Sequence, residues 1–553
     1  MWVGDAAYTE KIINGKRGLP VESNRKTKNQ KQGIENSLHT FFFRFDGGFV
    51  NTTKTLLHTN LDVLSRIGYD DLSRSTNMRL FFSLVLFTLL SANIATGQQP
   101  APTPTLHTEK TVVEMARIRD LALSSDYAYK LVEHLSRNIG PRLSGSSQAQ
   151  KAVEYVASEM RKLGLEVRLQ KVMVPHWVRG EEKGEIVEFP GMAAGTTQKI
   201  VLTALGGSVA TPADGITADV VVVNNFEELN SLGREKIAGK IVLFNNKFDI
   251  EMERSGFGLA AYGEAVRYRF GAAMAAGRLG AAAVLVRSAG SSQNRLAHTG
   301  SLGYANDVPK IPGAGVTFED ADTIAYLAAQ GRVRAHITLT PQTLPDTESY
   351  NVIADLKGSV TPDDVVIVSG HLDSWDLGQG AIDDGAGVAV SASVPYLLKQ
   401  LNLQPKRTIR FIAWMNEENG GRGSAGYAAE QKDNFGKHFA AIESDLGASH
   451  PVGFVFAGKK EALPFFETIS GVLRSQGSSL VQQQDNVGSD VGPLTAVGVP
   501  SFAPWFDQRT YFKYHHTAAD TFDKIVPREL AEVSSVMAVL AYGLANLERP
   551  LPR

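Results

Sequence analysis

A histidine and several acidic residues follow one apolar run in the middle of the sequence. The β-branched residues Val365 to Val368 lead into His371, Asp373 and Asp383 within VVIVSGHLDSWDLGQGAIDDGAG. Imidazole and carboxylate groups are ligands that suit zinc. Because sites in open α/β sheets form where strands end at their carboxyl edge, this pattern predicts a buried strand that leads into a metal-binding loop.

Two further strand-like runs end in acidic residues in the same way. Residues 408–415 (TIRFIAWM) lead into Glu417 and Glu418, and residues 439–444 (FAAIES) lead into Asp445. If the three strands are parallel neighbours, their carboxyl ends lie at one edge of the sheet. We therefore expect an acidic pocket at that edge.

A hydrolase with two zinc ions needs one ligand shared by both metals, further ligands on each, and a free carboxylate that accepts a proton from water. The sequence offers a candidate for each role. Neighbouring side chains near a strand end point in different directions, so Glu418 can face the metals while Glu417 acts as the general base. The other candidates are His371 for one metal, Asp383 as the bridge, Asp445, and one histidine of the pair His515–His516 in YHHTAADT.

Several of these residues have a simpler explanation when each is taken alone. A lone pair such as Glu417 and Glu418 is typical of a solvated loop. Asp376 and Asp384 are expected to be loop or helix-cap residues, and His515 is expected to be structural or to face the substrate. The order in which all of them occur along the chain nevertheless favours a metal site.

The composition narrows the class of protein. The 553 residues are 43% hydrophobic and 21% charged, which is typical of a soluble globular protein with two or three domains. The net charge of −2 gives no indication of nucleic-acid binding. The sequence contains no cysteine, so disulfides and thiolate metal sites are excluded and any metal must be held by histidine and carboxylate.

The N-terminal region resembles an export signal. Residues 78–97 combine Met78 and Arg79, an apolar stretch over 80–90, and a small-residue cleavage site at 95–97. The apolar stretch is shorter than the roughly 20 residues that a membrane span needs. We therefore expect a secreted or periplasmic protein without a stable membrane span after signal cleavage. Residues 1–77 would then be an upstream extension and 98–107 a Pro- and Thr-rich linker; an N-terminal membrane anchor with a cytoplasmic tail is the alternative.

The remaining sequence predicts an α/β fold in two parts. Residues 108–190 and 346–553 alternate helix-like and strand-like segments, which predicts a mostly parallel, mixed sheet flanked by helices. Residues 191–345 instead carry short strands between Gly- and Ala-rich turns. We expect them to form an inserted β-rich module that covers or shapes the site without contributing chemistry. Its histidines, His298 and His336, are expected to be surface or satisfied core residues.

The motifs GHLDSWD, IDDGAG, NEENGGRGS, ESDLG and YHHTAADT resemble those of the di-zinc exopeptidases of the aminopeptidase and glutamate carboxypeptidase superfamily. The similarity covers roughly residues 110–548, and the inserted module resembles a protease-associated domain. The resemblance implies that Asp373 orients His371 and that Glu417 acts as the base. It implies five zinc ligands for two ions: His371, Asp383 as the bridge, Glu418, Asp445 and His516.

The resemblance also implies an activity. Relatives remove one residue at a time from short peptides, so we expect an exopeptidase that acts on dipeptides or peptide ends, and a homodimer is possible by the same analogy. A receptor-like binder without catalysis and a glutaminyl cyclase with one zinc are the alternatives. Preference for the amino or the carboxyl end stays open. Some loop residues are expected near the site without an assigned role: Asn486, Ser489, Asp490, Tyr511 and Tyr514.

Overall fold

The computed structural model describes residues 106–553. The predicted upstream extension, the signal peptide and most of the linker lie outside the described residues. Within 106–553, no helix is both long and apolar enough to cross a membrane.

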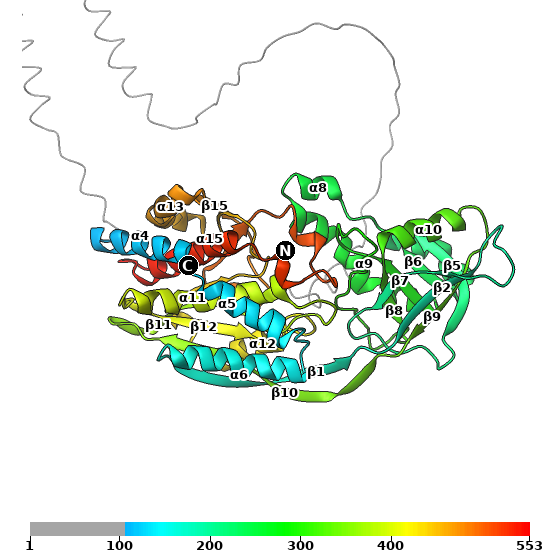
Figure 1. Cartoon of the computed structure of the whole chain (residues 1–553), viewed down its shortest axis with the longest axis horizontal. Coiled ribbons are helices and arrows are strands. Elements are labelled where there is room, and N and C mark those ends of the chain that lie inside the picture. The colour runs from blue at the N-terminus through cyan, green and yellow to red at the C-terminus, as the bar shows by residue number, and fades with distance from the viewer. Residues whose placement is uncertain (1–105) are drawn as a thin grey trace, which may run out of the picture. The chain divides into compact units, whose positions relative to one another are not determined.

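A mixed eight-stranded sheet forms the first layer of the fold (Figure 1). Its three central strands run parallel and are the three that the sequence places before the candidate ligands. The outer pairs include antiparallel neighbours. In spatial order the strands are β1 (Glu166–Val178), β10 (Gln342–Leu356), β12 (Arg407–Trp414), β11 (Thr361–His371), β13 (His438–Glu443), β16 (Ser501–Phe506), β14 (Pro451–Ala457) and β15 (Leu480–Gln483).

Helices cover both faces of this sheet because successive strand residues point to opposite sides. Val366 and Val368 of β11 pack into the larger core, whereas Val365 and Ile367 pack into a smaller one on the other face. The larger core contains helices α4 (Glu109–Ser124), α5 (Tyr127–Glu133), α6 (Ser147–Lys162), α11 (Ala386–Gln400) and α15 (Pro527–Ala545). The smaller core contains α12 (Arg422–Glu430) and α14 (Gly492–Ala496).

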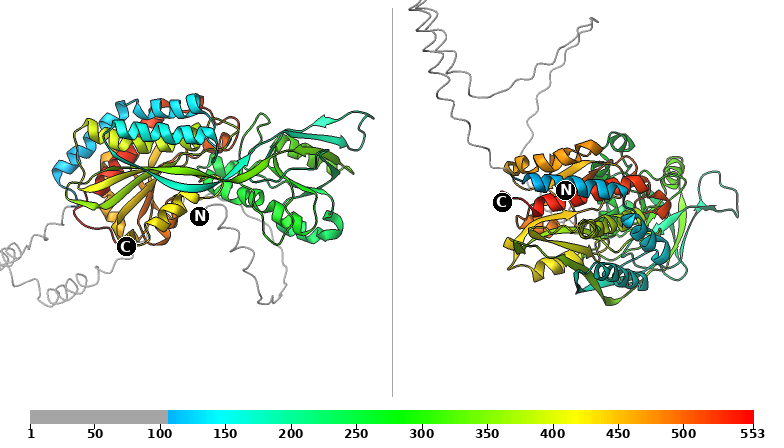
Figure 2. Two further views of the ribbon diagram at one scale, coloured as in Figure 1. Left: turned by 90° about the horizontal axis from the view of Figure 1, so that it is seen from below. Right: turned by 60° about the vertical axis from the view of Figure 1, so that its left-hand side comes forward.

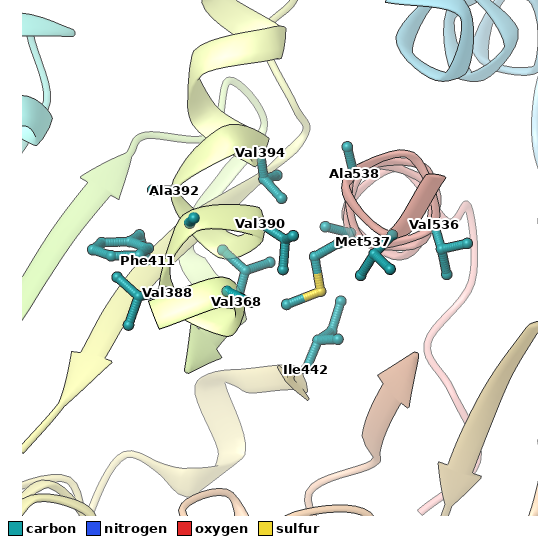
Figure 3. Packing of buried hydrophobic residues seen from close by; sticks show 14 of the residues in the cluster. Val368, Val388, Val390, Ala392, Val394, Phe411, Ile442, Val536, Met537 and Ala538 are labelled. Atoms are coloured by element: carbon teal, nitrogen blue, oxygen red, sulfur yellow. The ribbon is translucent and has the colours of Figure 1, made fainter. Parts of the chain in front are cut away.

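Helices α11 and α15 lie side by side on one face of the sheet, and α11 also contacts α4 and α5, which explains why α11 is apolar on all sides. Figure 3 shows Val388 and Val390 of α11 beside Val368 of β11, with Met537 of α15 extending toward Val390 and Val368. All four side chains are fully buried. The N-terminal end of α11 is thereby fixed directly behind the loop that carries Asp383.

Residues that follow β1 and precede β10 in the sequence form a second eight-stranded sheet. The antiparallel ribbon of β1 and β10 leads from the first sheet into β2 and β9 of the second (Figure 2). In spatial order its strands are β3 (Gln198–Lys199), β2 (Glu182–Glu188), β9 (Arg334–Leu339), β5 (Ile216–Val223), β6 (Ile241–Phe244), β7 (Ala283–Arg287), β8 (Gly313–Val316) and β4 (Leu202–Ala204). We call residues 182–339 the inserted unit.

The inserted unit has its own helices and its own core. Helices α7 (Phe226–Ile237), α8 (Ile250–Arg254), α9 (Gly258–Arg278) and α10 (Phe318–Ala328) accompany the strands, and apolar residues of this unit form two separate clusters. The described inserted unit therefore contains four α-helices beside its strands, and the prediction of a β-rich module did not include them. The prediction of an α/β fold with a mixed sheet between helices is confirmed.

Candidate metal centre

The carboxyl ends of β11, β12 and β13 bring the predicted ligands together. His371 is the last residue of β11, Glu417 and Glu418 follow the end of β12, and Asp445 follows the end of β13. The three strands are parallel neighbours, so residues separated by more than 70 positions meet at one edge of the sheet. The sequence-based expectation of an acidic pocket at this edge agrees with the observed placement.

Two groups of ligand-type atoms share Asp383. In the first group, His371 Nε2 lies 3.1 Å from Asp383 Oδ1 and 3.2 Å from Asp445 Oδ1. In the second group, His516 Nε2 lies 2.9 Å from Glu418 Oε2 and 3.2 Å from Asp383 Oδ2. The ligand-type atoms within each group lie within 4.8 Å of one another. All five residues that the sequence predicted as ligands are therefore in this cluster.

The loop that carries Asp383 is held by two other carboxylates. Asp520 accepts hydrogen bonds from the backbone N–H groups of Ala381, Ile382 and Asp383. Asp384 accepts one from the His371 N–H at 2.9 Å and one from Gly387 at 2.9 Å, at the start of α11. Asp384 thus behaves as the cap residue that the sequence predicted, and its side chain points away from the Asp383 groups.

Arg142 ties the same loop to the end of β11. Arg142 is fully buried, and its guanidinium donates to the carbonyl oxygens of Leu372, Gln379 and Gly380 at 2.8, 2.9 and 2.7 Å. It also donates to the carbonyl of Gly140 at 3.1 Å. One cation therefore fixes the backbone beside His371 and the backbone that precedes Asp383.

Asp373 links His371 to Glu417. Its backbone oxygen lies 3.0 Å from His371 Nδ1, which fixes the ring so that Nε2 faces Asp383. Its carboxylate accepts the N–H groups of Asn416 at 2.7 Å and Glu417 at 3.1 Å, and the hydroxyl of Ser144 at 2.9 Å. Asp373 is completely buried and so sets the backbone position from which the Glu417 side chain extends.

Glu417 lies beside the cluster and has no place in either group. Burial raises the pKa of its carboxyl group well above the usual range; His371 opposes this shift, and Asp445 and Glu418 add to it. Its side chain is half-buried, so it borders both the cluster and solvent. A carboxyl group with an elevated proton affinity next to ligand-type residues has the chemistry of a proton acceptor.

The inserted unit reaches this centre, as expected of a module that covers or shapes the site. His298 is 1% exposed, and its Nε2 lies 3.3 Å from His515 Nδ1. Thr299 N–H donates to the carbonyl of His516 at 2.9 Å, and Ser301 Oγ donates to the carbonyl of Glu418 at 2.7 Å. His336 is a surface residue that pairs with Thr217, as expected.

His298, His515 and His516 also form a group of nitrogen atoms within 4.8 Å of one another. Arg269 Nη1 lies 3.4 Å from His516 Nδ1. A guanidinium this close opposes binding of a further cation. His515 therefore fits the structural or substrate-facing role that the sequence indicated, and no single-sequence signal distinguishes the buried His298 from a surface histidine.

The donor set of the two groups fits a resident metal. Among the described residues, the buried oxygen Glu418 Oε1 has no hydrogen-bond partner, and the buried oxygen Asp383 Oδ2 has none in hydrogen-bond geometry, although His516 Nε2 lies 3.2 Å and His515 Nε2 3.4 Å from it. Burial raises the pKa of Glu418 to about 7, and although burial alone would lower the pKa of His516, Glu418 and Asp383 raise it to about 9. Packed carboxylates with unsatisfied oxygens favour a bound cation. Imidazole with carboxylate is a zinc-type donor set.

A small pocket opens onto the second group. Asp383, Glu418 and His516 line it together with Trp375, Thr517 and Asp520. Gly378 and Gly380 complete the lining. The pocket has a volume of about 10 Å³ and borders the Glu418–His516 half of the centre.

The loop that follows β15 lies on the other side of the centre. Glu443 accepts the N–H groups of Asp490 and Val491, and the Asp490 carboxylate contributes to the raised pKa of Glu417. Within 106–553, Asn486 Nδ2 and Ser489 Oγ are buried without a hydrogen-bond partner. The rings of Tyr511 and His515 lie with their centroids 4.9 Å apart and their planes tilted by 37°. Asp490 and Tyr511 are therefore near the site, as the sequence indicated.

Comparison with known proteins agrees with this geometry. The sequence profile of peptidase family M28 matches residues 351–541, which include all five predicted ligands. The chain belongs to this family, and it is a metallo-exopeptidase.

The particular proteins that this chain resembles are peptidases by name. Carboxypeptidase Q from Bos taurus is 38% identical over 428 residues, which cover 77% of this chain and 87% of the relative. The structure of a peptidase M28 precursor from Shewanella amazonensis SB2B aligns with a TM-score of 0.75 and 35% identity, over 80% of this chain and 99% of that one. BSAP, a zinc aminopeptidase from Bacillus subtilis, shares the fold with a TM-score of 0.55 and 22% identity, over 77% and 98%.

Proposed function

We propose that this protein is a secreted zinc exopeptidase that hydrolyses dipeptides or the terminal residue of short peptides. The observation that carries the proposal is the sharing of Asp383 between two groups of ligand-type atoms. Two ions would be held, one by His371, Asp383 and Asp445 and one by Asp383, Glu418 and His516. The 38% identity to carboxypeptidase Q and the similarity to a zinc aminopeptidase support this choice of reaction and metal.

Zinc at these positions supplies a Lewis acid that polarises the scissile carbonyl and makes water more acidic. The residues of the chain supply the rest. Glu417 accepts the proton of the attacking water and later donates it to the leaving amine, for which its raised proton affinity is suited. Asp373 holds both His371 and the Glu417 backbone, so that the ligand and the base keep a fixed separation.

The inserted unit covers the centre and contributes to its walls. It resembles a protease-associated domain in sequence, and we propose that it shapes the substrate site. Thr299 and Ser301 hold the backbone of His516 and Glu418. Because these two residues belong to the same group, the inserted unit supports the half of the centre that faces the pocket.

Replacement of Glu417 by Gln tests the assigned chemistry. The change removes the proton acceptor and leaves all five ligand residues in place, so zinc content stays at the wild-type value while kcat for dipeptides falls by about 100-fold or more. Glu430→Gln is the matched control, because Glu430 lies at the surface and pairs with Arg168. Its kcat should equal that of the wild-type enzyme.

A panel of dipeptides and blocked peptides shows which end is recognised. Loss of hydrolysis after acetylation of the amino end identifies an aminopeptidase-type preference, and loss after amidation of the carboxyl end identifies the opposite one.

Full activity of Glu417→Gln would refute the base assignment. Well-folded protein that neither binds zinc nor hydrolyses any peptide would instead indicate a binding protein on this fold.

A further inference from the structure

Trp375 carries a buried hydrogen-bond donor at the metal centre. It is 4% exposed and lines the same pocket as Asp383, Glu418 and His516. In the part of the chain that the structure describes, its indole Nε1 has no hydrogen-bond partner. Leaving a buried N–H group unpaired costs about 1–3 kcal/mol. An acceptor from outside the protein is therefore needed to satisfy it.

The inserted unit fixes the orientation of this indole. A Cβ atom at Gly206 would lie 1.9 Å from Cη2 and 2.4 Å from Cζ3 of Trp375, so the benzene edge of the indole presses against the Gly206 backbone. The ring also meets His516 edge-on, with centroids 5.9 Å apart and planes at 66°. This packing fixes the benzene half of a ring that lines the pocket, and the buried Nε1 lies on the other half of the indole.

The other polar side chains that line the pocket either have hydrogen-bond partners within the protein or can only accept hydrogen bonds. The Thr517 hydroxyl donates to the carbonyl of Tyr514 at 2.7 Å, and Asp520 accepts three backbone N–H groups. His516 pairs with Glu418 and Asp383. Of the side chains that line the pocket in the described structure, Trp375 alone presents an unpartnered donor.

We propose that the indole N–H of Trp375 donates a hydrogen bond to the oxygen of the scissile carbonyl and holds that oxygen as it becomes negatively charged in the tetrahedral intermediate. The inference rests on the proposed peptide hydrolysis. Glu418 and Asp383 repel such an oxygen, so a neutral donor beside them stabilises it without adding charge to the ligand cluster. A preorganised donor of this kind contributes about 100- to 1,000-fold to kcat.

Nuclear magnetic resonance of the indole groups tests the contact directly. The sequence contains five tryptophans, so 15N-labelled, zinc-loaded protein gives at most five indole signals, and the Trp375→Phe variant identifies the one from Trp375. A phosphinate analogue of a dipeptide carries tetrahedral, anionic oxygens at the position of the scissile carbonyl. Its addition to the wild-type protein should move the Trp375 proton signal downfield, because an N–H group that donates to an anion is deshielded.

Kinetics of two variants give an independent readout. Trp375→Phe keeps an aromatic ring and removes the N–H group, so kcat and affinity for the phosphinate should fall by about 100-fold while KM and zinc content change little. Trp177→Phe is the matched control. Trp177 packs in the same cluster as Trp375, but its N–H donates to the carbonyl of Ser208 at 3.0 Å, so this change should lower stability and leave phosphinate affinity intact.

The outcomes separate this inference from the proposed function. A wild-type enzyme that hydrolyses dipeptides and binds the phosphinate without moving the Trp375 signal would overturn the assignment, because a bound water would then satisfy the N–H group. Equal loss of phosphinate affinity in both variants would also overturn it. A zinc-loaded wild-type protein that neither hydrolyses dipeptides nor binds the phosphinate would overturn the proposed function together with this inference.

Discussion

Replacement of Arg142 by Met should both destabilise the protein and weaken its metal site. The guanidinium is fully buried and makes four hydrogen bonds of 3.1 Å or shorter to backbone carbonyls at the end of β11, in the segment that precedes Asp383 and at Gly140. Methionine fills most of the same volume and provides no donor. The four carbonyls would then lose their partner in an interior where few waters can replace it.

The size of the effect follows from these contacts. A hydrogen bond to a charged group contributes about 1.5–3 kcal/mol, so four bonds give a gross loss of about 6–12 kcal/mol. Rehydration of the carbonyls offsets part of this loss, and so does the absence of a buried cation that has to be desolvated. Removal of one partner from a buried charged network costs about 3–5 kcal/mol in practice. We expect a loss in that range, which is a large share of the typical 5–15 kcal/mol of total stability.

Urea unfolding followed by circular dichroism measures this loss, and titration of metal-free protein with zinc measures the second effect. Because Arg142 orients the backbone beside two ligands, zinc affinity should fall about 10- to 100-fold. Arg168→Met is the control: this exposed arginine pairs with Glu430, and exposed ion pairs contribute about 0–1 kcal/mol. If Arg142→Met loses less than about 1 kcal/mol and binds zinc as the wild type does, the role assigned to Arg142 is wrong.

Two further predictions concern pH and packing. Burial lowers the pKa of His438 from 6.5 to about 4, so the unfolded chain binds more protons between these values and stability falls as pH drops through that window. From pH 7 to pH 5 the free energy of unfolding of the wild type should fall by about 2 kcal/mol more than that of His438→Gln. Urea unfolding of the two metal-free proteins measures this difference, and an equal fall in both would refute the prediction. Gly206→Ala should cost about 1–3 kcal/mol, because its Cβ meets Trp375, and should lower kcat. Gly263→Ala, with open space at its Cβ, should leave both thermal stability and kcat at least at the wild-type level, and equal behaviour of the two variants would contradict the packing argument.

The ligand cluster could be predicted because each ligand follows a recognisable element. His371, Glu418 and Asp445 come directly after β-branched or apolar runs, and parallel strands place such positions at one edge. Asp383 and His516 lie in the short motifs IDDGAG and YHHTAADT, and the resemblance to the exopeptidase motifs distinguishes them from the neighbouring Asp384 and His515. The local sequence therefore contained the information that positions the cluster.

The remaining features depend on contacts between distant parts of the chain. His298 and Ser301 lie more than 100 residues before Glu418, and only the tertiary packing of the inserted unit brings them to the site. Arg142 lies in a turn-rich loop, where an arginine normally indicates a surface. Strand β16 was not predicted because Pro504 interrupts it; proline weakens a strand assignment, yet Pro504 pairs with Phe454 of β14.

The number of zinc ions per chain tests the central claim most directly. Elemental analysis and calorimetric titration of the full chain, purified without chelator, should give two zinc ions, and Glu418→Gln should retain one, held by His371, Asp383 and Asp445. A wild-type protein that binds a single zinc ion, or a Glu418→Gln variant that still binds two with unchanged affinity, would contradict a two-metal centre bridged by Asp383.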